Sequence, residues 1–289
     1  MHNILVTGGL GQLARAIRHV ACEASDGYVF LSHDETDICR REAIESAIAK
    51  HNIDIVINCA AYTDVERAEE DEAAARRINR DGVATLAEVC NSRGIKLIHI
   101  STDFVFGGDS ERNVPYTEEV AAAPINAYGR TKAEGESEAL RCRGAVVVRT
   151  SWLYSPWGHN FCRTILRLAQ EHDTLRVVSD QRGTPTSALS LARMLVGLIR
   201  RGEIEQMSGI YHYSDAGEAS WYDFACAIVA IGGIDCHIEP CLTAERNDKA
   251  RRPHYSVLDK SRITKIEGVA IREWREALSE CITLIRRER

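Results

Sequence analysis

The segment Thr7-Gly8-Gly9-Leu10-Gly11-Gln12-Leu13-Ala14, near the start of the chain, decides the fold. It follows a short apolar run, Asn3–Thr7, that is typical of a β-strand, and it opens a stretch with helical periodicity. Gly8 and Gly11 stand where a strand must turn sharply and let a phosphate approach backbone N–H groups. The small Ala14 lets the helix pack closely on the strand. The segment predicts a dinucleotide-binding turn, although a plain strand-to-helix turn also uses glycine.

The first half of the chain alternates apolar runs with longer helical patterns. The predicted strands are Asn3–Thr7, Tyr28–Leu31, Asp54–Asn58, Lys96–Ile100 and Ala145–Thr150. The predicted helices are Gln12–Ala24, Arg41–Lys50, Asp71–Arg93 and Tyr128–Leu140. Near-continuous apolar strands separated by helices are typical of a parallel sheet that is covered on both faces. The pattern predicts the α/β class, with a Rossmann-type doubly wound parallel sheet.

The pattern is less regular after residue 150. Further strands are predicted at Arg176–Ser179 and Ile210–Tyr213, and helices at Asn160–His172, Ser187–Arg201, Ser220–Ile231 and Trp274–Arg287. Loops are expected around Pro124, Pro156, Pro185, Pro240 and Pro253. We expect a dinucleotide-binding domain over residues 1–150, with 187–208 returning to it. A smaller α/β substrate-binding lobe would take residues 151–186 and 209–289.

Composition and charge narrow the classes of partner. The 289 residues include 36 Lys and Arg against 42 Asp and Glu, a formal net charge of −6. This mild acidity argues against a nucleic-acid or membrane-surface binder. No stretch approaches the ~20 apolar residues of a membrane span, and no signal-peptide pattern is present. The ten cysteines are scattered, without a CxxC pair, which is typical of reduced thiols and offers no zinc site. We expect a cytoplasmic protein.

A second pair of motifs indicates proton transfer at a carbonyl. The fourth predicted strand runs into Thr102, and the chain continues to a Tyr-x-x-x-Lys pair, Tyr128 and Lys132. Residues four apart share one helix face, so the phenol and the ammonium can point into one cleft. The ammonium should lower the pKa of the phenol from ~10, and the Thr102 hydroxyl can bind the same substrate oxygen. The trio suits hydride transfer, although surface helices carry such pairs by chance.

The segment after the second strand is expected to meet the adenosine end of a cofactor. Asp34 could accept a hydrogen bond from the ribose 2′-hydroxyl and so favour NAD, whereas Arg15 could bind a 2′-phosphate and so favour NADP. Asp37 and Ile38 would lie near the adenine. A solvated surface explains all four residues equally well, so the choice between NADH and NADPH stays open.

Taken together, these motifs resemble the extended short-chain dehydrogenase/reductase superfamily and, within it, the dTDP-4-dehydrorhamnose reductase family. The superfamily motifs are Gly8-x-x-Gly11-Gln12-Leu13, Asn58-Cys59-Ala60-Ala61-Tyr62-Thr63-Asp64-Val65, Ser101-Thr102-Asp103-Phe104-Val105-Phe106 and Tyr128-Gly129-x-Thr131-Lys132. The segments typical of the family are Arg149-Thr150-Ser151-Trp152-Leu153-Tyr154, Asn160-Phe161, Asp180-Gln181-x-Gly183-x-Pro185-Thr186 and Arg252-Pro253-x-x-Ser256-x-Leu258. The resemblance runs nearly from end to end.

The resemblance implies reduction of the C4 keto group of dTDP-4-dehydro-L-rhamnose with NADPH or NADH. It implies that the cofactor contacts Gly8, Gly11, Gln12, Leu13, Asp37, Ile38, Ala60, Ala61, Tyr62, Tyr128 and Lys132. Tyr128 would be the acid and Lys132 its partner. Thr102 and Asp103 would contact the sugar. Phe104 stands where the family often has tyrosine, so a hydroxyl contact is lost there.

Two further groups of residues suit the nucleotide part of such a substrate. Trp152 and Tyr154 follow the fifth strand and could stack on a sugar or a base, or simply pack in the core. Arg251, Arg252 and His254 form a basic cluster suited to a diphosphate, or a solvated loop. The loop Asp180–Thr186 is either a substrate loop or a turn.

Other functions and partners remain open at this stage. A nucleotide-sugar epimerase or dehydratase of the same superfamily would regenerate its cofactor in each cycle. A regulatory subunit similar to that of methionine adenosyltransferase would bind a partner enzyme, but the intact Thr102, Tyr128 and Lys132 argue against this role. Some members of this reductase family dimerise around Mg²⁺, so the resemblance allows a homodimer and a Mg²⁺ site. No glutamate cluster in the sequence identifies the ligands.

Overall fold

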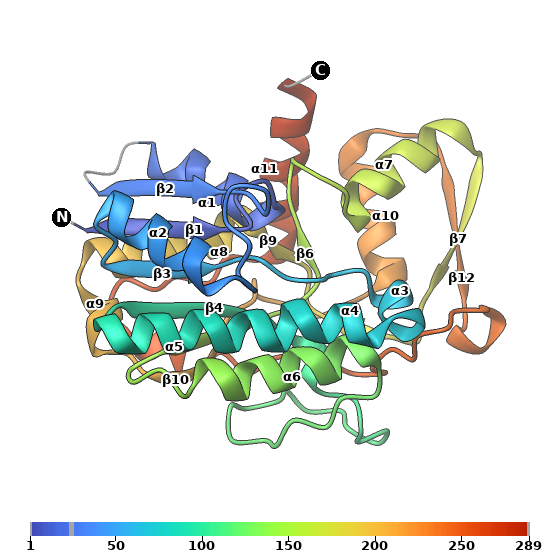
Figure 1. Cartoon of the computed structure of the whole chain (residues 1–289). Helices are drawn as coiled ribbons and strands as arrows, with labels where there is room; N and C mark the ends of the chain where they lie inside the picture. Colours follow the sequence, from blue (N-terminus) through green and yellow to red (C-terminus); the bar gives the residue numbers. More distant parts are fainter. Residues whose placement is uncertain (1, 23–25, 288–289) are drawn as a thin grey trace.

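A six-stranded parallel sheet forms the centre of the computed structural model, which describes residues 2–22 and 26–287 (Figure 1). The strand order is β10-β5-β4-β3-β1-β2. The strands are β1 (Asn3–Thr7), β2 (Gly27–Leu31), β3 (Ile55–Asn58), β4 (Lys96–Thr102), β5 (Val146–Thr150) and β10 (Gly209–His212). From β1, the chain first adds β2 on one side and then crosses to the other side, where it adds β3, β4 and β5 in turn. The strand order therefore reverses between β1 and β3. Ligands of such sheets bind at the carboxyl ends of the strands near this reversal.

Helices cover both faces of the sheet, as the apolar strands predict. One core layer packs α1 (Gln12–Ala21) and α8 (Ala188–Arg200) on strand residues such as Val6 and Ile57. The opposite layer packs α2 (Arg41–His51), α5 (Val83–Arg93) and the end of α6 (Ala127–Ala139) on Leu5 and Val56. Because adjacent strand residues point to opposite faces, both faces carry apolar side chains. The inner strands are mostly buried, and the edge strands β2 and β10 are largely half-buried.

Strand β10 corrects one boundary of the sequence analysis. Residues 209–289 were expected in the substrate-binding lobe, but Gly209–His212 pairs in parallel with β5 and extends the large sheet. The short helix α9 (Glu203–Gln206) leads into it. A four-residue apolar strand carries no sequence signal for the sheet that it joins, because pairing is decided by the neighbours that it meets in space.

The second lobe lies beside the sheet and has its own core. Helices α7 (Phe161–Glu171), α10 (Trp221–Gly232) and α11 (Trp274–Arg287) pack around Phe224 and Trp274. A parallel pair, β7 (Thr174–Val178) and β12 (His237–Cys241), covers this core at one side (Figure 1). Short pairs join β6 (Leu153–Tyr154) to β9 (Thr186–Ser187), and β8 (Arg182–Gly183) to β11 (Ala219–Ser220). The sequence analysis missed β12 and placed Pro240 in a loop; this strand pairs with β7 alone, and proline is tolerated at an edge.

The predicted helix Asp71–Arg93 is interrupted. It consists of α4 (Glu72–Arg76), a π-helical segment at Arg77–Gly82 and α5, and a further helix, α3 (Val65–Glu70), precedes it. Asn79, inside the π segment, holds the backbone of Tyr62 and the hydroxyl of Thr131. Such bulges are frequent at functional sites, and this one lies beside α6. The predicted end of the first helix, at Ala24, falls outside the described residues.

Two further properties concern the described residues only. No helix in ranges 2–22 and 26–287 is both long and apolar enough to cross a bilayer. All ten cysteines lie in these ranges and are free thiols.

Candidate functional site

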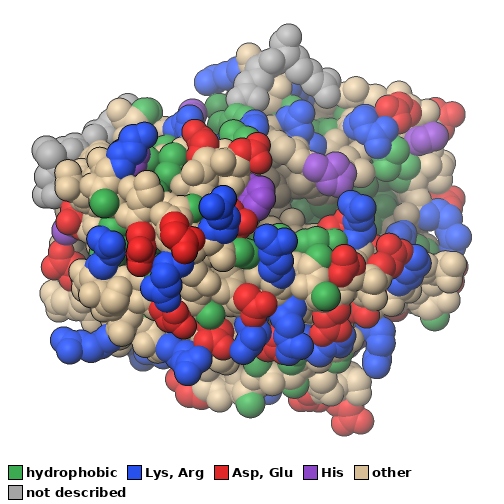
Figure 2. All heavy atoms as spheres, viewed as in Figure 1, with side chains coloured by type: hydrophobic (Ala, Val, Ile, Leu, Met, Phe, Trp, Pro, Cys, Tyr) green, Lys and Arg blue, Asp and Glu red, His purple; other side chains and the backbone are tan. Residues whose placement is uncertain are grey.

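A large cavity opens at the carboxyl ends of the sheet strands, between the sheet and the second lobe. Its volume is about 1140 Å³, enough for two ligands of nucleotide size. Figure 2 shows the surface hollowed here, with apolar side chains in the hollow and charges of both signs around it. Most residues predicted for the site line this cavity: Gly8, Gly11, Gln12, Leu13, Asp34, Asp37, Ile38, Ala60, Ala61, Thr102, Asp103, Phe104, Tyr128, Lys132, Trp152 and Arg252.

The glycine turn after β1 leaves no room for larger side chains. Gly8 has φ +62°, and a Cβ atom there would lie 2.9 Å from the Ala60 backbone. The turn is closed by a hydrogen bond from Gly11 N to Gly8 O of 2.8 Å. Helix α1 begins without a side-chain cap and without an acidic residue in its first turn. Its N-terminal N–H groups and dipole therefore suit the pyrophosphate of a dinucleotide.

Gln12 connects this turn to the second lobe. Its Oε1 atom accepts hydrogen bonds from Asn160 Nδ2 over 2.9 Å and from Ser155 Oγ over 3.1 Å. Asn160 also caps α7 through Arg163 N. The start of α1 and the start of α7 are thus held next to each other, and both contribute residues to the cavity wall.

The loop after β2 lines the end of the cavity that would hold the adenosine. Asp34 and Asp37 face this space. Burial alone would raise the pKa of Asp37, but the Cys39 N–H and nearby His33 and Arg77 hold it below its usual value. Both donors of Ser32 are taken by Glu35, whose Oε2 atom accepts from N and Oγ at 2.8 Å. Arg15, in contrast, donates to Leu10 O and does not line the cavity.

Thr102 and Tyr128 meet at the centre of the cavity wall. Thr102 ends β4, and Tyr128 lies in the first turn of α6, which Asn126 caps through Gly129 N at 2.7 Å. Burial raises the pKa of Tyr128 to about 12, against a hydrogen bond with the Thr102 hydroxyl and with a further rise from Asp103. The sequence analysis predicts a Tyr128 pKa below ~10; that prediction is wrong, because burial outweighs the influences that favour the phenolate. A phenol with a raised pKa is protonated at neutral pH, as a proton donor must be.

Lys132 is buried one helical turn from Tyr128. Its ammonium donates to the carbonyl of Ile100 at 2.7 Å and lies 3.5 Å from the His99 ring. Burial lowers the pKa of Lys132 to about 8, while the charge of Glu136 acts in the opposite direction. The group therefore titrates close to neutral pH, within reach of the cavity.

Asp103 joins the two lobes at the chemical centre. Its Oδ2 atom accepts a hydrogen bond of 2.6 Å from Ser256, and its Oδ1 atom one of 3.2 Å from Thr102. Burial raises the pKa of Asp103 to about 7, against these two hydrogen bonds. At neutral pH the group is therefore shared between a hydrogen-bond donor and an acceptor state. The Ser256 contact gives a physical role to one position of the family segment around residues 252–258.

Aromatic side chains form the second-lobe wall. Trp152 has φ +46°, which is rare for a residue other than glycine, and its ring stacks on Trp221 at 3.6 Å. Phe161 lies against Trp221, with ring centroids 4.6 Å apart. A Cβ atom on Gly183 would lie 2.5 Å from the Trp152 ring, so Gly183 gives the indole its space. Sequence reasoning missed Trp221, because a tryptophan at the start of an amphipathic helix also suits a core.

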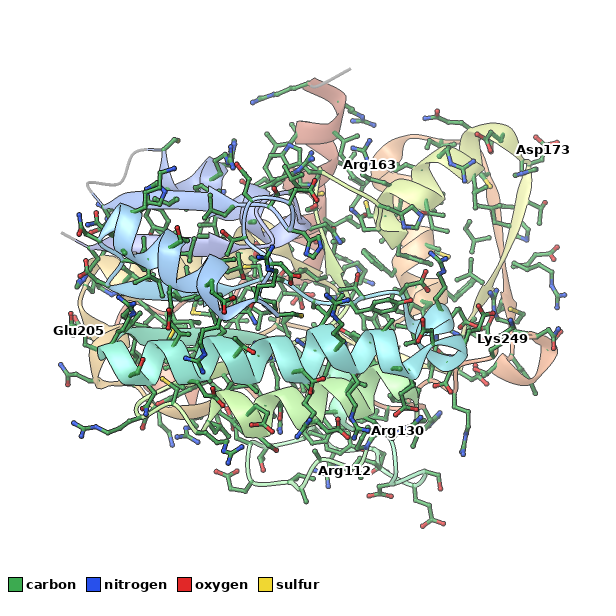
Figure 3. All side chains as sticks on the ribbon, in the orientation of Figure 1. Arg112, Arg130, Arg163, Asp173, Glu205 and Lys249 are labelled. Atoms are coloured by element: carbon green, nitrogen blue, oxygen red, sulfur yellow. The ribbon has the colours of Figure 1, made fainter. Side chains whose placement is uncertain are left out.

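Arg252 lines the cavity but its charge is already paired. Its guanidinium donates to Glu66 Oε1 at 2.7 Å and to Asp248 Oδ2 at 2.8 Å. Glu66 lies on α3 and also accepts from Lys249 N at 2.9 Å. Figure 3 places Lys249 close to α3, where its side chain pairs with Glu70. A diphosphate would have to share Arg252 with these carboxylates.

Several predicted site residues lie elsewhere. Tyr62 does not line the cavity; its N–H and carbonyl are both bound to Asn79. Tyr154 is fully buried in the second-lobe core. Arg251 and His254 are also absent from the cavity wall, and His254 contacts Asp180 O through its ring. Within the Asp180–Thr186 loop, the Asp180 side chain accepts from Thr243, so this loop braces the second lobe.

Among residues 2–22 and 26–287, none can be assigned to Mg²⁺. In the described part of the chain, no group of three or more His, Cys, Asp or Glu side chains is placed to hold a metal ion.

The chain is a Rossmann-type α/β protein of the extended short-chain dehydrogenase/reductase class. Three features define this class: the doubly wound sheet, the glycine turn at α1 and the cluster of Thr102, Tyr128 and Lys132. The sequence matches the family described as "RmlD substrate binding domain" over residues 1–287. The chain belongs to this family.

Relatives and solved structures agree over almost the whole chain. The dTDP-4-keto-6-deoxy-D-glucose reductase of Streptomyces niveus is 38% identical, over 97% of this chain and 96% of the relative. A dTDP-4-dehydrorhamnose reductase crystal structure from Clostridium acetobutylicum is 38% identical, with a TM-score of 0.92 and coverage of 98% and 99%. The enzyme of the same description from Bacillus anthracis, in complex with NADP, is 32% identical with the same TM-score and coverage.

Proposed function

We propose that this protein reduces the C4 keto group of a dTDP-linked 4-keto-6-deoxy sugar, dTDP-4-dehydro-L-rhamnose, with NADPH or NADH. The observation that carries the proposal is the position of Thr102, Tyr128 and Lys132 in the wall of one cavity with the uncapped start of α1. The family membership and the printed activities of the full-length relatives support it. The turn fits a dinucleotide, because α1 begins there without a side-chain cap and without an acidic residue in its first turn, which leaves N–H groups for a pyrophosphate.

The chemistry of the proposed reaction follows from the protonation states. A bound nicotinamide would supply the hydride. Tyr128, protonated at neutral pH, donates its proton to the alkoxide oxygen that forms at C4. Thr102 orients the same oxygen, and Asp103, held by Ser256, orients a neighbouring sugar hydroxyl. Lys132 stabilises the phenolate left on Tyr128.

A reductase assay with purified dTDP-4-dehydro-L-rhamnose tests the proposal, run separately with NADH and NADPH. Net oxidation of the cofactor, in proportion to the sugar added, is expected. An epimerase or dehydratase would convert its sugar without net oxidation. A pull-down of a stoichiometric synthetase, without any turnover, would instead support the regulatory role.

The first testable prediction concerns Tyr128→Phe. This variant should lose about 10²–10⁴-fold in kcat, the usual contribution of a general acid, while its affinity for NADPH changes little. Steady-state kinetics and cofactor fluorescence titration measure both quantities. Tyr222→Phe, at a tyrosine outside the cavity wall, is the matched control and should keep wild-type turnover. A Tyr128→Phe variant with near-normal kcat would exclude Tyr128 as the acid.

Four properties stay predictions: the preference between the two cofactors, the identity of the true sugar, a homodimer and a cytoplasmic location. Asp34 and Asp37 beside the adenosine end, and Arg15 turned to Leu10, support NADH. The NADP complex of the Bacillus anthracis relative supports NADPH. The paired assay distinguishes them by the ratio of kcat/KM values.

A further inference from the structure

His99 is a buried titratable residue that the proposed mechanism does not use. It lies in β4, three residues before Thr102, and is fully buried. Its Nε2 atom lies 3.5 Å from Lys132 Nζ, and its Nδ1 atom lies 3.0 Å from Asn58 Nδ2. Burial, together with the charge of Lys132, holds the pKa of His99 well below its usual value. The ring is therefore neutral, and the nitrogen that carries its one proton decides how it acts on Lys132.

The orientation of the Asn58 amide fixes that nitrogen. The backbone N–H of Ala60 can only donate, and it lies 3.2 Å from Asn58 Oδ1. The Thr7 hydroxyl donates to the same oxygen over 2.6 Å. The amide oxygen thus faces two donors, and its NH₂ group faces His99. Because an NH₂ group only donates, Nδ1 of His99 must accept, and the proton sits on Nε2.

The Nε2–H group of His99 is directed at Lys132. If Lys132 is a charged ammonium, the Nε2–H of His99 meets a group that can only donate, and no hydrogen bond forms. If Lys132 is a neutral amine, its lone pair accepts a hydrogen bond from Nε2–H. The other titratable groups facing Lys132 are Glu136 on α6, whose charge favours the ammonium, and Cys59 after β3, whose thiol burial keeps protonated. His99 is therefore the polar neighbour on β4 that favours the neutral amine.

We infer that His99 is a positioning residue for the proposed reaction: its Nε2–H favours the neutral amine of Lys132 and so eases the release of the Lys132 proton during turnover. The inference rests on the proposed function. In the step concerned, a Lys132 N–H bond breaks and the proton reforms the O–H bond of the Tyr128 phenolate. The neutral amine of Lys132 then takes a proton from solvent water before the next turnover. His99 keeps its own proton and changes no bond.

A second buried histidine in the same sheet provides a contrast. His212, in β10, places Nδ1 at 3.1 Å from the carbonyl of Tyr116, which only accepts, so its proton sits on Nδ1. Its Nε2 atom then accepts from Arg149 at 3.3 Å. His212 thus meets its cation with a lone pair, whereas His99 meets Lys132 with a proton.

Long-range ¹H–¹⁵N NMR of the full chain, labelled with ¹⁵N-histidine, reads both tautomers directly. We expect the Nε2–H form for His99 and the Nδ1–H form for His212. Spectra of His99→Gln and His212→Gln assign the two signals by their loss. An Nδ1–H tautomer or an imidazolium at His99 would overturn the inference. This readout needs no turnover, so it can fail or succeed separately from the proposed function.

Titration of the Lys132 side chain by NMR tests the effect itself. His99→Leu removes the N–H, and the Lys132 midpoint should rise by about half to one pH unit, the size of one hydrogen bond. His99→Gln can accept from Asn58 and still donate towards Lys132, so its midpoint should stay near that of the wild type. His212→Gln should also leave the midpoint unchanged. An unchanged or lowered midpoint in His99→Leu contradicts the inference; if that variant does not fold, the tautomer of the wild type decides.

Discussion

At the scale of single residues, the site depends on polar groups whose partners come from distant parts of the chain. Asp103 follows β4, yet the hydroxyl that fixes its carboxylate belongs to Ser256, 153 positions further on. Burial raises the pKa of Asp103 to about 7, and this hydrogen bond opposes the rise. Asp103 therefore titrates at a pH set jointly by both lobes.

Ser256→Ala should raise the pKa of Asp103 further, because the hydrogen bond that it removes favours the carboxylate. In the wild type, the folded chain holds the Asp103 proton at pH values where the unfolded chain has lost it, so the free energy of unfolding falls as pH rises from about 4 to about 7. In the variant, this decline should extend above pH 7. Carboxyl NMR and urea unfolding across the pH range measure both effects.

The control for this prediction is Ser261→Ala, which removes a similar Ser–Asp hydrogen bond, to Asp259, at the exposed surface. It should leave the Asp103 midpoint unchanged. A midpoint that does not move in Ser256→Ala would show that Ser256 supplies packing alone.

At the scale of elements, α6 carries the chemistry because it approaches its neighbours very closely. A Cβ atom at Gly135 would lie 2.0 Å from the carbonyl of Asn79 in the π segment, and one at Gly129 would lie 2.1 Å from the carbonyl of Phe104. Both obstacles are backbone atoms and cannot turn aside. Gly135 thus allows the close approach of α6 to the π segment, and Gly129 its close approach to the residues that follow β4.

Gly135→Ala should destabilise the protein by about 1–3 kcal/mol, as overpacking does, although alanine is the better helix former. Gly197→Ala is the matched control in another helix, α8, where the new methyl meets only the far end of the Arg201 side chain, 3.0 Å away. This variant should gain up to about 1 kcal/mol. Urea unfolding of both variants tests the pair, and equal effects would contradict the close approach of α6.

Local sequence patterns predict some elements of this fold and miss others. The strands β1 to β5, the glycine turn and the Tyr128–Lys132 face were predictable because apolar periodicity and helix spacing are local. The π segment at Arg77–Gly82 was not predictable, because it accompanies contacts of Asn79 with Tyr62 and Thr131, which are distant in sequence. Arg252 was assigned to a ligand from its charge, yet charge alone does not reveal that Glu66 and Asp248 pair with it.

At the scale of the whole molecule, α3 and the loop around residues 248–252 join the two lobes. Glu66 accepts from Lys249 N and from the Arg252 guanidinium, and so holds the loop that presents Arg252 to the cavity. Glu66→Ala should raise KM for the nucleotide sugar several-fold, with a smaller change in cofactor affinity, because Arg252 loses its position. Steady-state kinetics with each ligand varied measure the split.

Glu70→Ala is the control for that variant, since it removes only the exposed pair with Lys249 and should stay near wild-type values. A lower KM in Glu66→Ala would mean that Glu66 competes with the diphosphate for Arg252 instead of positioning it.

The place of β10 and α8 in the large sheet also governs how the chain can be made. A ribosome releases the first five strands of the sheet well before Gly209–His212 and before the helix that covers α1. Residues 151–186, most of which belong to the second lobe, are synthesised in between. During synthesis, one edge of the nascent sheet and part of one face therefore stay uncovered until over two hundred residues have emerged. A fragment cut at residue 150 would keep that exposed state permanently.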